Sequence, residues 1–242
     1  MRIAHVSDLH ITGTNFVEQW GENLIKKLNE IEPDIVVITG DLTDDGYEYE
    51  YEIVREYLDR IEARKIVVPG NHDARNKGYE IFEEVFGTRY PFYEDSKVAI
   101  LGIDSSEPDL DDGHIGRENY PIIEEKLGGK NKIRILALHH HLIPIPGTGR
   151  ERNIPIDAGD VLQLCKNLEL NFVLSGHKHL PWIWRLEKTY YITAGTATSR
   201  RLKGKSYPSF NVMELNEKTV IKEINVANGN ERIVRKIEID II

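Results

Sequence analysis

Cysteine is almost absent from this sequence: Cys165 is the only one among 242 residues. A single thiol cannot form an intramolecular disulfide, so a packed core must hold the fold together, and a reducing compartment is compatible with the sequence. A chain of this length with 40% hydrophobic residues can bury such a core. Cys165 lies in the stretch "DVLQLCKNLEL", where we expect a helix and a buried, inert thiol.

Long apolar runs and positive charge are also scarce. No stretch approaches the roughly 18 to 20 apolar residues of a membrane span, and the N-terminus lacks the order of a signal peptide. We therefore expect no membrane association and a cytoplasmic location. With 31 Lys and Arg against 40 Asp and Glu, the net charge is −9, which argues against binding of nucleic-acid polymers because Lys and Arg must neutralise their phosphates. A small phosphoester remains open, since metal ions can supply positive charge locally.

Short β-branched runs alternate with helical patterns over the first part of the chain. Buried strands are predicted at residues 2–8, 34–41, 64–71, 97–104, 133–140 and 171–177. Helices are predicted between them, at residues 17–32, 48–63, 79–87, 120–129 and 157–170. This alternation predicts an α/β protein with parallel strands. Strands alone follow, at residues 182–187, 189–195, 209–216, 220–227 and 233–241, and they suggest antiparallel pairing in a second sheet packed on the first.

No repeat, low-complexity segment or interdomain linker interrupts the pattern, so residues 1–242 are expected to form a single domain. Its oligomeric state is left open by the sequence.

Polar side chains collect where the predicted parallel strands end. They are Asp8, His10, Asp41, Asn71, His72, His139, His140, His141, His177 and His179. Taken alone, an Asp-x-His pair such as "DLH" is usually a solvated strand end. The carboxyl ends of parallel strands line the ligand crevice of an α/β sheet, so the whole series is expected to converge in space.

The ordered series resembles the calcineurin-like metallophosphoesterases. Their pattern of Asp-x-His, Gly-Asp, Gly-Asn-His-Asp/Glu, His and Gly-His-x-His is matched without a gap from Ile3 to about Leu215. The stretches "ITAGTATSRR" and "PSFNVMEL" are similar to those of bacterial and archaeal cyclic-nucleotide phosphodiesterase-like members. The resemblance implies an α/β fold with a two-sheet β-sandwich flanked by helices in four layers. It also implies metal-dependent hydrolysis of a small phosphoester, with a phosphodiester as the preferred substrate.

Other functions are weighed against this one. A phosphomonoesterase or nucleotide hydrolase is the alternative reaction. A binding or scaffold protein that kept the fold but lost the chemistry is the alternative of a different class, and such a protein would be expected to have lost metal ligands. A nuclease is disfavoured by the acidic charge balance.

By the same resemblance, seven side chains hold two metal ions: Asp8, His10, Asp41, Asn71, His139, His177 and His179. Asp41 would bridge the ions. Mixed imidazole, carboxylate and amide ligation suits Mn²⁺, Fe, Zn²⁺ or Co²⁺ better than Ca²⁺ or Mg²⁺. Two such ions about 3.5 to 4 Å apart can generate hydroxide and neutralise phosphoryl oxygens. His72 would stay off the metals and contact the phosphate or protonate the leaving group, with Asp73 orienting it.

Within "HHH", the motif register favours His139 as the ligand, and a slip of one residue to His140 is the alternative. If the strand continues through this run, His139 and His141 share one face and His140 takes the other. Among the remaining histidines, His5 is expected in the core. His114 is expected in an exposed loop, with a substrate contact as the alternative.

Further side chains could select the substrate. Trp182 and Trp184, at strand spacing, offer a stacking platform for a nucleobase, although packing at a sheet edge is the expected role. Four arginines could bind a phosphate or could be solvated: Arg150, Arg152, Arg200 and Arg201.

Overall fold

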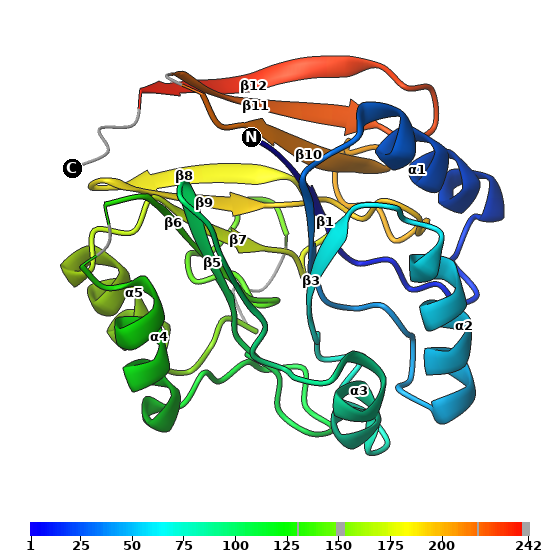
Figure 1. The fold of residues 1–242 in the computed structure, drawn as a ribbon. Helices are drawn as coiled ribbons and strands as arrows, with labels where there is room; N and C mark the ends of the chain where they lie inside the picture. The colour runs from blue at the N-terminus through cyan, green and yellow to red at the C-terminus, as the bar shows by residue number, and fades with distance from the viewer. Residues whose placement is uncertain (130, 149–152, 217, 239–242) are drawn as a thin grey trace.

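The computed structural model describes residues 1–129, 131–148, 153–216 and 218–238 (Figure 1). The strands are β1 (Arg2–Val6), β2 (Ile35–Thr39), β3 (Arg64–Val68), β4 (Phe92–Glu94), β5 (Val98–Gly102), β6 (Ile133–Ala137), β7 (Phe172–Ser175), β8 (Trp182–Leu186), β9 (Thr189–Thr193), β10 (Ser209–Glu214), β11 (Lys218–Asn225) and β12 (Glu231–Glu238). The helices are α1 (Glu18–Ile31), α2 (Glu48–Asp59), α3 (Gly78–Phe86), α4 (Tyr120–Leu127) and α5 (Ala158–Asn167), with a 3₁₀ turn at Arg117–Asn119.

The strands form two mixed sheets of six. The first has the order β12-β11-β10-β1-β2-β3, in which β1, β2 and β3 are parallel and the three C-terminal strands run antiparallel to their neighbours. The second has the order β4-β5-β6-β7-β9-β8, in which β5, β6, β7 and β9 are parallel and the two edge strands are antiparallel. Each sheet therefore contains parallel strands whose carboxyl ends can meet those of the other.

Side-chain alternation along the strands sets the order of the layers. In β1, Ile3 belongs to the core between the two sheets, whereas Ala4 and Val6 pack in a separate core with α1, α2 and α3. In β6, Ile135 faces the other sheet and Leu136 packs with α4 and α5. Figure 1 shows the two groups of helices on opposite sides of the paired sheets. The four-layer sandwich implied by the sequence is confirmed.

The C-terminal strands differ from the expectation. They do not build a second sheet of their own: β8 and β9 extend the sheet of β5–β7, while β10, β11 and β12 extend the sheet of β1–β3. One of them, β9, pairs parallel to β7 rather than antiparallel. The short strand β4 was not predicted. The sequence pattern of a strand does not show which sheet the strand joins, because both sheets accept further strands beside their parallel ones.

Cys165 lies in α5 and is fully buried among apolar side chains of the second sheet and its helices. Burial raises the pKa of its thiol to about 12. Because the thiolate is the reactive form, we expect Ellman's reagent to label the native protein at a rate on the order of a hundredfold below that of the protein unfolded in guanidinium chloride. Equal rates at pH 8 would show that the thiol is accessible and contradict this placement.

Candidate metal centre

The predicted site residues lie in the loops that follow β1, β2, β3, β6 and β7, so both sheets contribute. Backbone hydrogen bonds tie these loops together. Asp8 N donates to Gly40 O at 3.0 Å and His10 N donates to Asp41 O at 2.9 Å, while Gly176 N donates to His139 O at 2.9 Å. The convergence that the strand-end argument predicts is present in the structure.

Strand periodicity does not orient the side chains of Asp8 and His10, because β1 ends at Val6. Left-handed backbone conformations aim the side chains instead. They occur at Asp8, His10, Asp41, His177 and His179, with φ between 44° and 71°. Such values are uncommon outside glycine, and their concentration at one place is typical of a functional site whose surroundings impose the geometry.

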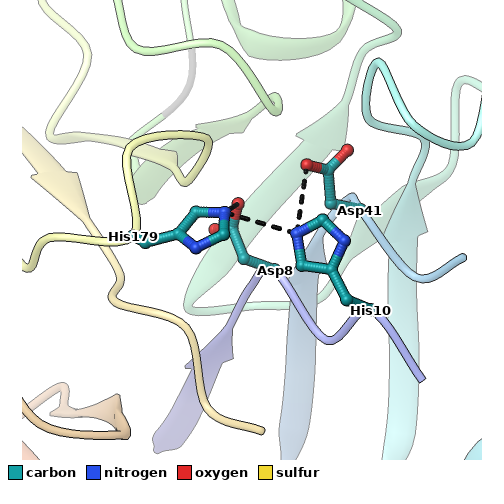
Figure 2. A group of neighbouring side chains, drawn as sticks. All are labelled: Asp8, His10, Asp41 and His179. Carbon is teal, nitrogen blue, oxygen red and sulfur yellow. Dashed lines mark hydrogen bonds and ion pairs between the residues drawn. The ribbon is translucent and has the colours of Figure 1, made fainter. Parts of the chain in front are cut away.

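One set of side chains, called here the Asp8 group, consists of Asp8, His10, Asp41 and His179 (Figure 2). All four are buried. His179 Nε2 lies 3.2 Å from Asp8 Oδ1 and 3.3 Å from His10 Nε2, and His10 Nε2 lies 3.6 Å from Asp41 Oδ2. One ligand atom from each of the four lies within 4.8 Å of those from the other three.

A second set, called here the Asn71 group, consists of Asp41, Asn71, His139 and His177. Asn71 Oδ1 lies 3.1 Å from His139 Nε2 and 3.0 Å from His177 Nδ1. His139 Nε2 also lies 3.4 Å from Asp41 Oδ1. The two carboxylate oxygens of Asp41 therefore face different groups, Oδ2 toward the Asp8 group and Oδ1 toward the Asn71 group.

Hydrogen bonds on the side of each imidazole or amide that points away from the centre determine which atom faces the centre. His139 Nδ1 lies 2.7 Å from the carbonyl oxygen of Thr39, and His179 Nδ1 lies 2.9 Å from that of Arg201. A carbonyl only accepts, so Nδ1 carries the hydrogen, and in the neutral imidazole Nε2 presents a lone pair to the centre. Asn71 Nδ2 donates to Asp111 Oδ1 at 3.0 Å, which turns the amide oxygen inward. Within each group, the hydrogen-bond acceptor atoms therefore face one another.

The electrostatics of the centre favour a positive charge. Burial alone would raise the pKa of Asp41, but the neighbouring His139 and His72 hold it well below its usual range. Burial alone would lower the pKa of His139, yet Asp41 and Asp8 raise it above its ordinary value. Two ligand atoms bound to one ion at about 2.1 Å lie roughly 3 to 3.5 Å apart, which matches the spacings above. The donor set, with its inward lone pairs, fits divalent metal binding.

His72 lies beside the Asp8 group without joining it. Its ring stands edge-on to that of His10, with centroids 4.7 Å apart. Its Nδ1 donates to the carbonyl oxygen of Asp44 at 2.6 Å, and its Nε2 lies 3.4 Å from Arg201 Nη1. The imidazole is therefore oriented from behind, and Nε2 is directed toward Arg201.

The expectation that Asp73 orients His72 is wrong. The Asp73 carboxylate is buried and accepts hydrogen bonds from the backbone N–H groups of Leu42, Thr43 and Gly70 and from the Thr43 hydroxyl. It therefore fastens the loop after β3 to the loop after β2, so its effect on the centre is exerted through the backbone.

Asp44, rather than Asp73, contacts the His72 imidazole. Sequence reasoning did not identify Asp44. Its Oδ1 lies 3.3 Å from His10 Nδ1 and 3.0 Å from Arg201 Nη2. The adjacent imidazole of His10, followed by the charge of Arg201, holds the pKa of Asp44 below its ordinary value. A carboxylate behind a metal-ligating imidazole fixes its tautomer and orientation. The only available signal was the second acid in "GDLTDD", which also suits an ordinary turn.

At Gly40 and Gly70, which precede Asp41 and Asn71, neighbouring loops approach too closely to leave room for a side chain. A Cβ added at Gly70 would lie 2.3 Å from Asp41 Oδ1, and one added at Gly40 would lie 2.6 Å from Gly70 N. Gly40 also has φ of 82°. Glycine at these two positions therefore permits the close approach of the two loops.

The three consecutive histidines lie beyond β6, which ends at Ala137, so strand alternation does not sort them. His139 faces the Asn71 group. His140 hydrogen-bonds the Ser105 hydroxyl at 2.9 Å through Nδ1 and contacts Asp111 O at 3.2 Å through Nε2. His141 is stacked on His177, with centroids 5.8 Å apart. The structure places His139, and not His140, among the inward-facing atoms.

The remaining candidates lie away from the centre. His5 is buried in the core with Nε2 3.0 Å from Thr39 Oγ1, as expected. His114 is partly exposed and pairs with Glu107 at 2.8 Å. Trp182 and Trp184 lie on the edge strand β8, where Trp184 donates to Pro144 O at 3.0 Å. This is the sheet-edge packing that was expected.

An open cleft of about 340 Å³ lies over the centre. Side chains of both groups line it, together with His72, Asp111, Arg201 and two lysines, Lys178 and Lys203. Arg200 is exposed and does not line the cleft. Arg150 and Arg152 lie outside the described residues.

Sequence comparison defines the class of protein. The family model for calcineurin-like phosphoesterases matches residues 1–181, and this chain belongs to that family. A probable cyclic nucleotide phosphodiesterase of Xenorhabdus bovienii is 26% identical over 205 residues, which cover 76% of this chain and 81% of that protein. A probable glycerophosphodiester phosphodiesterase of Arcobacter nitrofigilis is 30% identical over 156 residues, which cover 58% of this chain and 57% of that protein.

Solved structures share the fold. The purple acid phosphatase PPD1 of yellow lupin superposes with a TM-score of 0.76 at 14% identity, covering 96% of this chain and 52% of that one. GAP50, described as the anchor in the inner membrane complex of Plasmodium, superposes with a TM-score of 0.74 at 16% identity, covering 100% of this chain and 89% of that one. At such identities the likeness shows the fold alone. None of the described helices has the length and apolar character needed to cross a membrane.

The positions of the three histidines generate a test by substitution. His139→Ala removes an inward-facing nitrogen, so we expect one of two metal equivalents to be lost at micromolar Mn²⁺. His140→Ala and His141→Ala should retain both equivalents. At most they should lower the rate, since losing a residue outside the ligand set typically lowers affinity or activity by about 10 to 100-fold. Metal content after dialysis gives the answer, and loss of metal in His140→Ala with retention in His139→Ala would shift the register by one residue.

Proposed function

We propose that this protein is a phosphodiesterase with a dinuclear metal centre. The observation that carries the proposal is the placement of Asp41 between two sets of inward-facing acceptor atoms, with one carboxylate oxygen directed at each. Relatives of similar length are named phosphodiesterases, which supports this reaction over phosphomonoester or nucleotide hydrolysis.

In this proposal the Asp8 group holds one ion and the Asn71 group holds the other, with Asp41 shared. Mn²⁺, Fe, Zn²⁺ and Co²⁺ are the ions that suit imidazole, carboxylate and amide donors together. When bound, the ions activate water and neutralise phosphoryl oxygens. The chain supplies the rest: buried carboxylates set the charge, and the backbone carbonyls of Thr39 and Arg201 fix the ring orientations.

His72 performs the proton transfer. The carbonyl of Asp44 holds its Nδ1 hydrogen, while Nε2 lines the cleft beside Arg201. When the ring takes up a second proton at Nε2, that proton can pass to the leaving-group oxygen, and the adjacent guanidinium is suited to contact a phosphate oxygen.

A scaffold protein of the same fold fits these observations less well, because all seven expected ligand side chains are present and face one another. We further propose that residues 1–242 act as a single domain in the cytoplasm, on a small phosphoester rather than a nucleic-acid polymer. Strand pairing between β1 and β10 supports the single domain, since it places the first strand in one sheet with the last three strands.

Metal removal tests the proposed function directly. The protein purified with Mn²⁺ should bind two ions per chain and hydrolyse bis-p-nitrophenyl phosphate, because the lone pairs of both groups then have a cation. Treatment with a strong chelator followed by desalting should abolish release of p-nitrophenol, and added Mn²⁺ should restore it. Full activity of protein shown by elemental analysis to be metal-free would refute the mechanism.

Two substitutions separate metal binding from proton transfer. Asp41→Ala should lower the occupancy of both sites, since its carboxylate serves both. His72→Ala should keep two ions per chain and lower kcat by about 10² to 10⁴-fold, the usual contribution of a general acid or base.

His114→Ala, a histidine outside the centre, is the matched control and should retain both metal and rate. Loss of metal from His72→Ala, measured by elemental analysis, would instead make His72 a ligand.

A further inference from the structure

Basic side chains line the cleft over the centre, beside the carboxylates of Asp41 and Asp111, although the whole chain is acidic. Lys178, Arg201 and Lys203 all line it. Arg201 has an acidic partner, Asp44, at 3.0 Å. Among the described residues, no carboxylate oxygen lies within 4 Å of the ammonium nitrogen of Lys178 or Lys203. Lys178 and Lys203 therefore have no ion-pair partner among the described residues.

Lys178 is held in place by a neutral group. It lies between His177 and His179 in the sequence, and its Nζ donates to Asn153 Oδ1 at 3.3 Å. Asn153 in turn donates to Asp112 Oδ1 at 3.1 Å. The side chain is only partly exposed, so its charge is screened less by water than that of a surface lysine.

Arg201 and the two lysines have different surroundings. Arg201 reaches the Nε2 atom of His72, so it belongs with the scissile phosphate. That phosphate is a monoanion in a phosphodiester, and the metal centre, Arg201 and His72 already provide for it. Lys178 and Lys203 have no hydrogen bond to those groups. Asp111 and Asp112 act on Lys178 electrostatically, but neither forms an ion pair with it, so both ammonium groups can contact another anion.

We propose that Lys178 and Lys203 form a subsite for a second phosphate of the substrate, so that the enzyme acts on phosphodiesters that carry a terminal phosphate. A linear dinucleotide with a 5′-phosphate has this chemistry. Hydrolysis breaks one P–O bond of the internal diester; water supplies the oxygen that joins phosphorus and the proton that leaves with the alcohol. The inference rests on the proposed phosphodiesterase function and narrows its substrate class.

The experiment compares the dinucleotides TpT and pTpT, which differ only in the terminal phosphate. With the Mn²⁺-loaded protein, kcat/KM for pTpT should exceed that for TpT by about tenfold, the value of one charge-assisted hydrogen bond. In Lys203→Gln the ratio should fall, and in the double variant Lys178→Gln/Lys203→Gln it should approach one. Rising salt should reduce the wild-type ratio.

Lys188→Gln is the matched control, since Lys188 pairs with Glu169 at 2.6 Å and does not line the cleft. It should retain the wild-type ratio. Metal content is measured for every variant, so that a lysine effect transmitted through His177 or His179 is recognised. A wild-type ratio of one or below, or a ratio that survives in the double variant, overturns the subsite.

Binding separates this inference from the proposed function. If bis-p-nitrophenyl phosphate is hydrolysed and the two dinucleotides react equally, the subsite is refuted and the phosphodiesterase stands. If no diester is hydrolysed, calorimetry with His72→Ala still decides the subsite: about tenfold tighter binding of pTpT than of TpT supports it, and equal affinities refute it.

Discussion

Two carboxylates, Asp8 and Asp41, are buried next to each other, and the rest of the centre is arranged around that charge. Buried carboxylates are costly unless a cation and hydrogen bonds compensate them. The backbone N–H of His177 donates a bifurcated hydrogen bond to the two carboxylate oxygens of Asp8, and the backbone N–H of His72 donates to Asp41. The imidazole lone pairs face the same space, so a bound divalent ion is the compensation that fits both. The left-handed turns and the glycines before the predicted ligands allow five loops to meet around this space.

Outer contacts keep this arrangement in register. The carbonyls of Thr39 and Arg201 fix two imidazoles, and Asp73 ties together the loops that carry Asp41 and Asn71. Asp44 contacts His72 through its backbone carbonyl and contacts His10 and Arg201 through its carboxylate. One residue therefore links a proposed metal ligand, the proposed proton donor and the side chain proposed to contact phosphate. Such partners act through orientation, and their loss is expected to change function more than the fold.

The fold alone does not give the function. A phosphatase and a membrane-complex anchor both superpose on this chain at 14% and 16% identity, so the four-layer sandwich supports different functions. Function depends on the side chains placed at the strand ends. In this chain they combine a site suited to divalent cations with two lysines in the cleft above it that form no ion pair among the described residues, on a protein with a net charge of −9.

The sequence by itself indicated most of the elements and most of the residues that lie at the centre. Buried strands are readable because they are short apolar β-branched runs, and the polar residues Asp8, Asp41, Asn71 and His139 stand out where such runs end. Tertiary structure decided the rest. Which sheet β8–β12 join, whether Asp44 or Asp73 supports His72, and where each residue of "HHH" points all depend on contacts between segments about 30 to 170 residues apart or on left-handed turns beyond the strands. Local periodicity carries no information about such contacts.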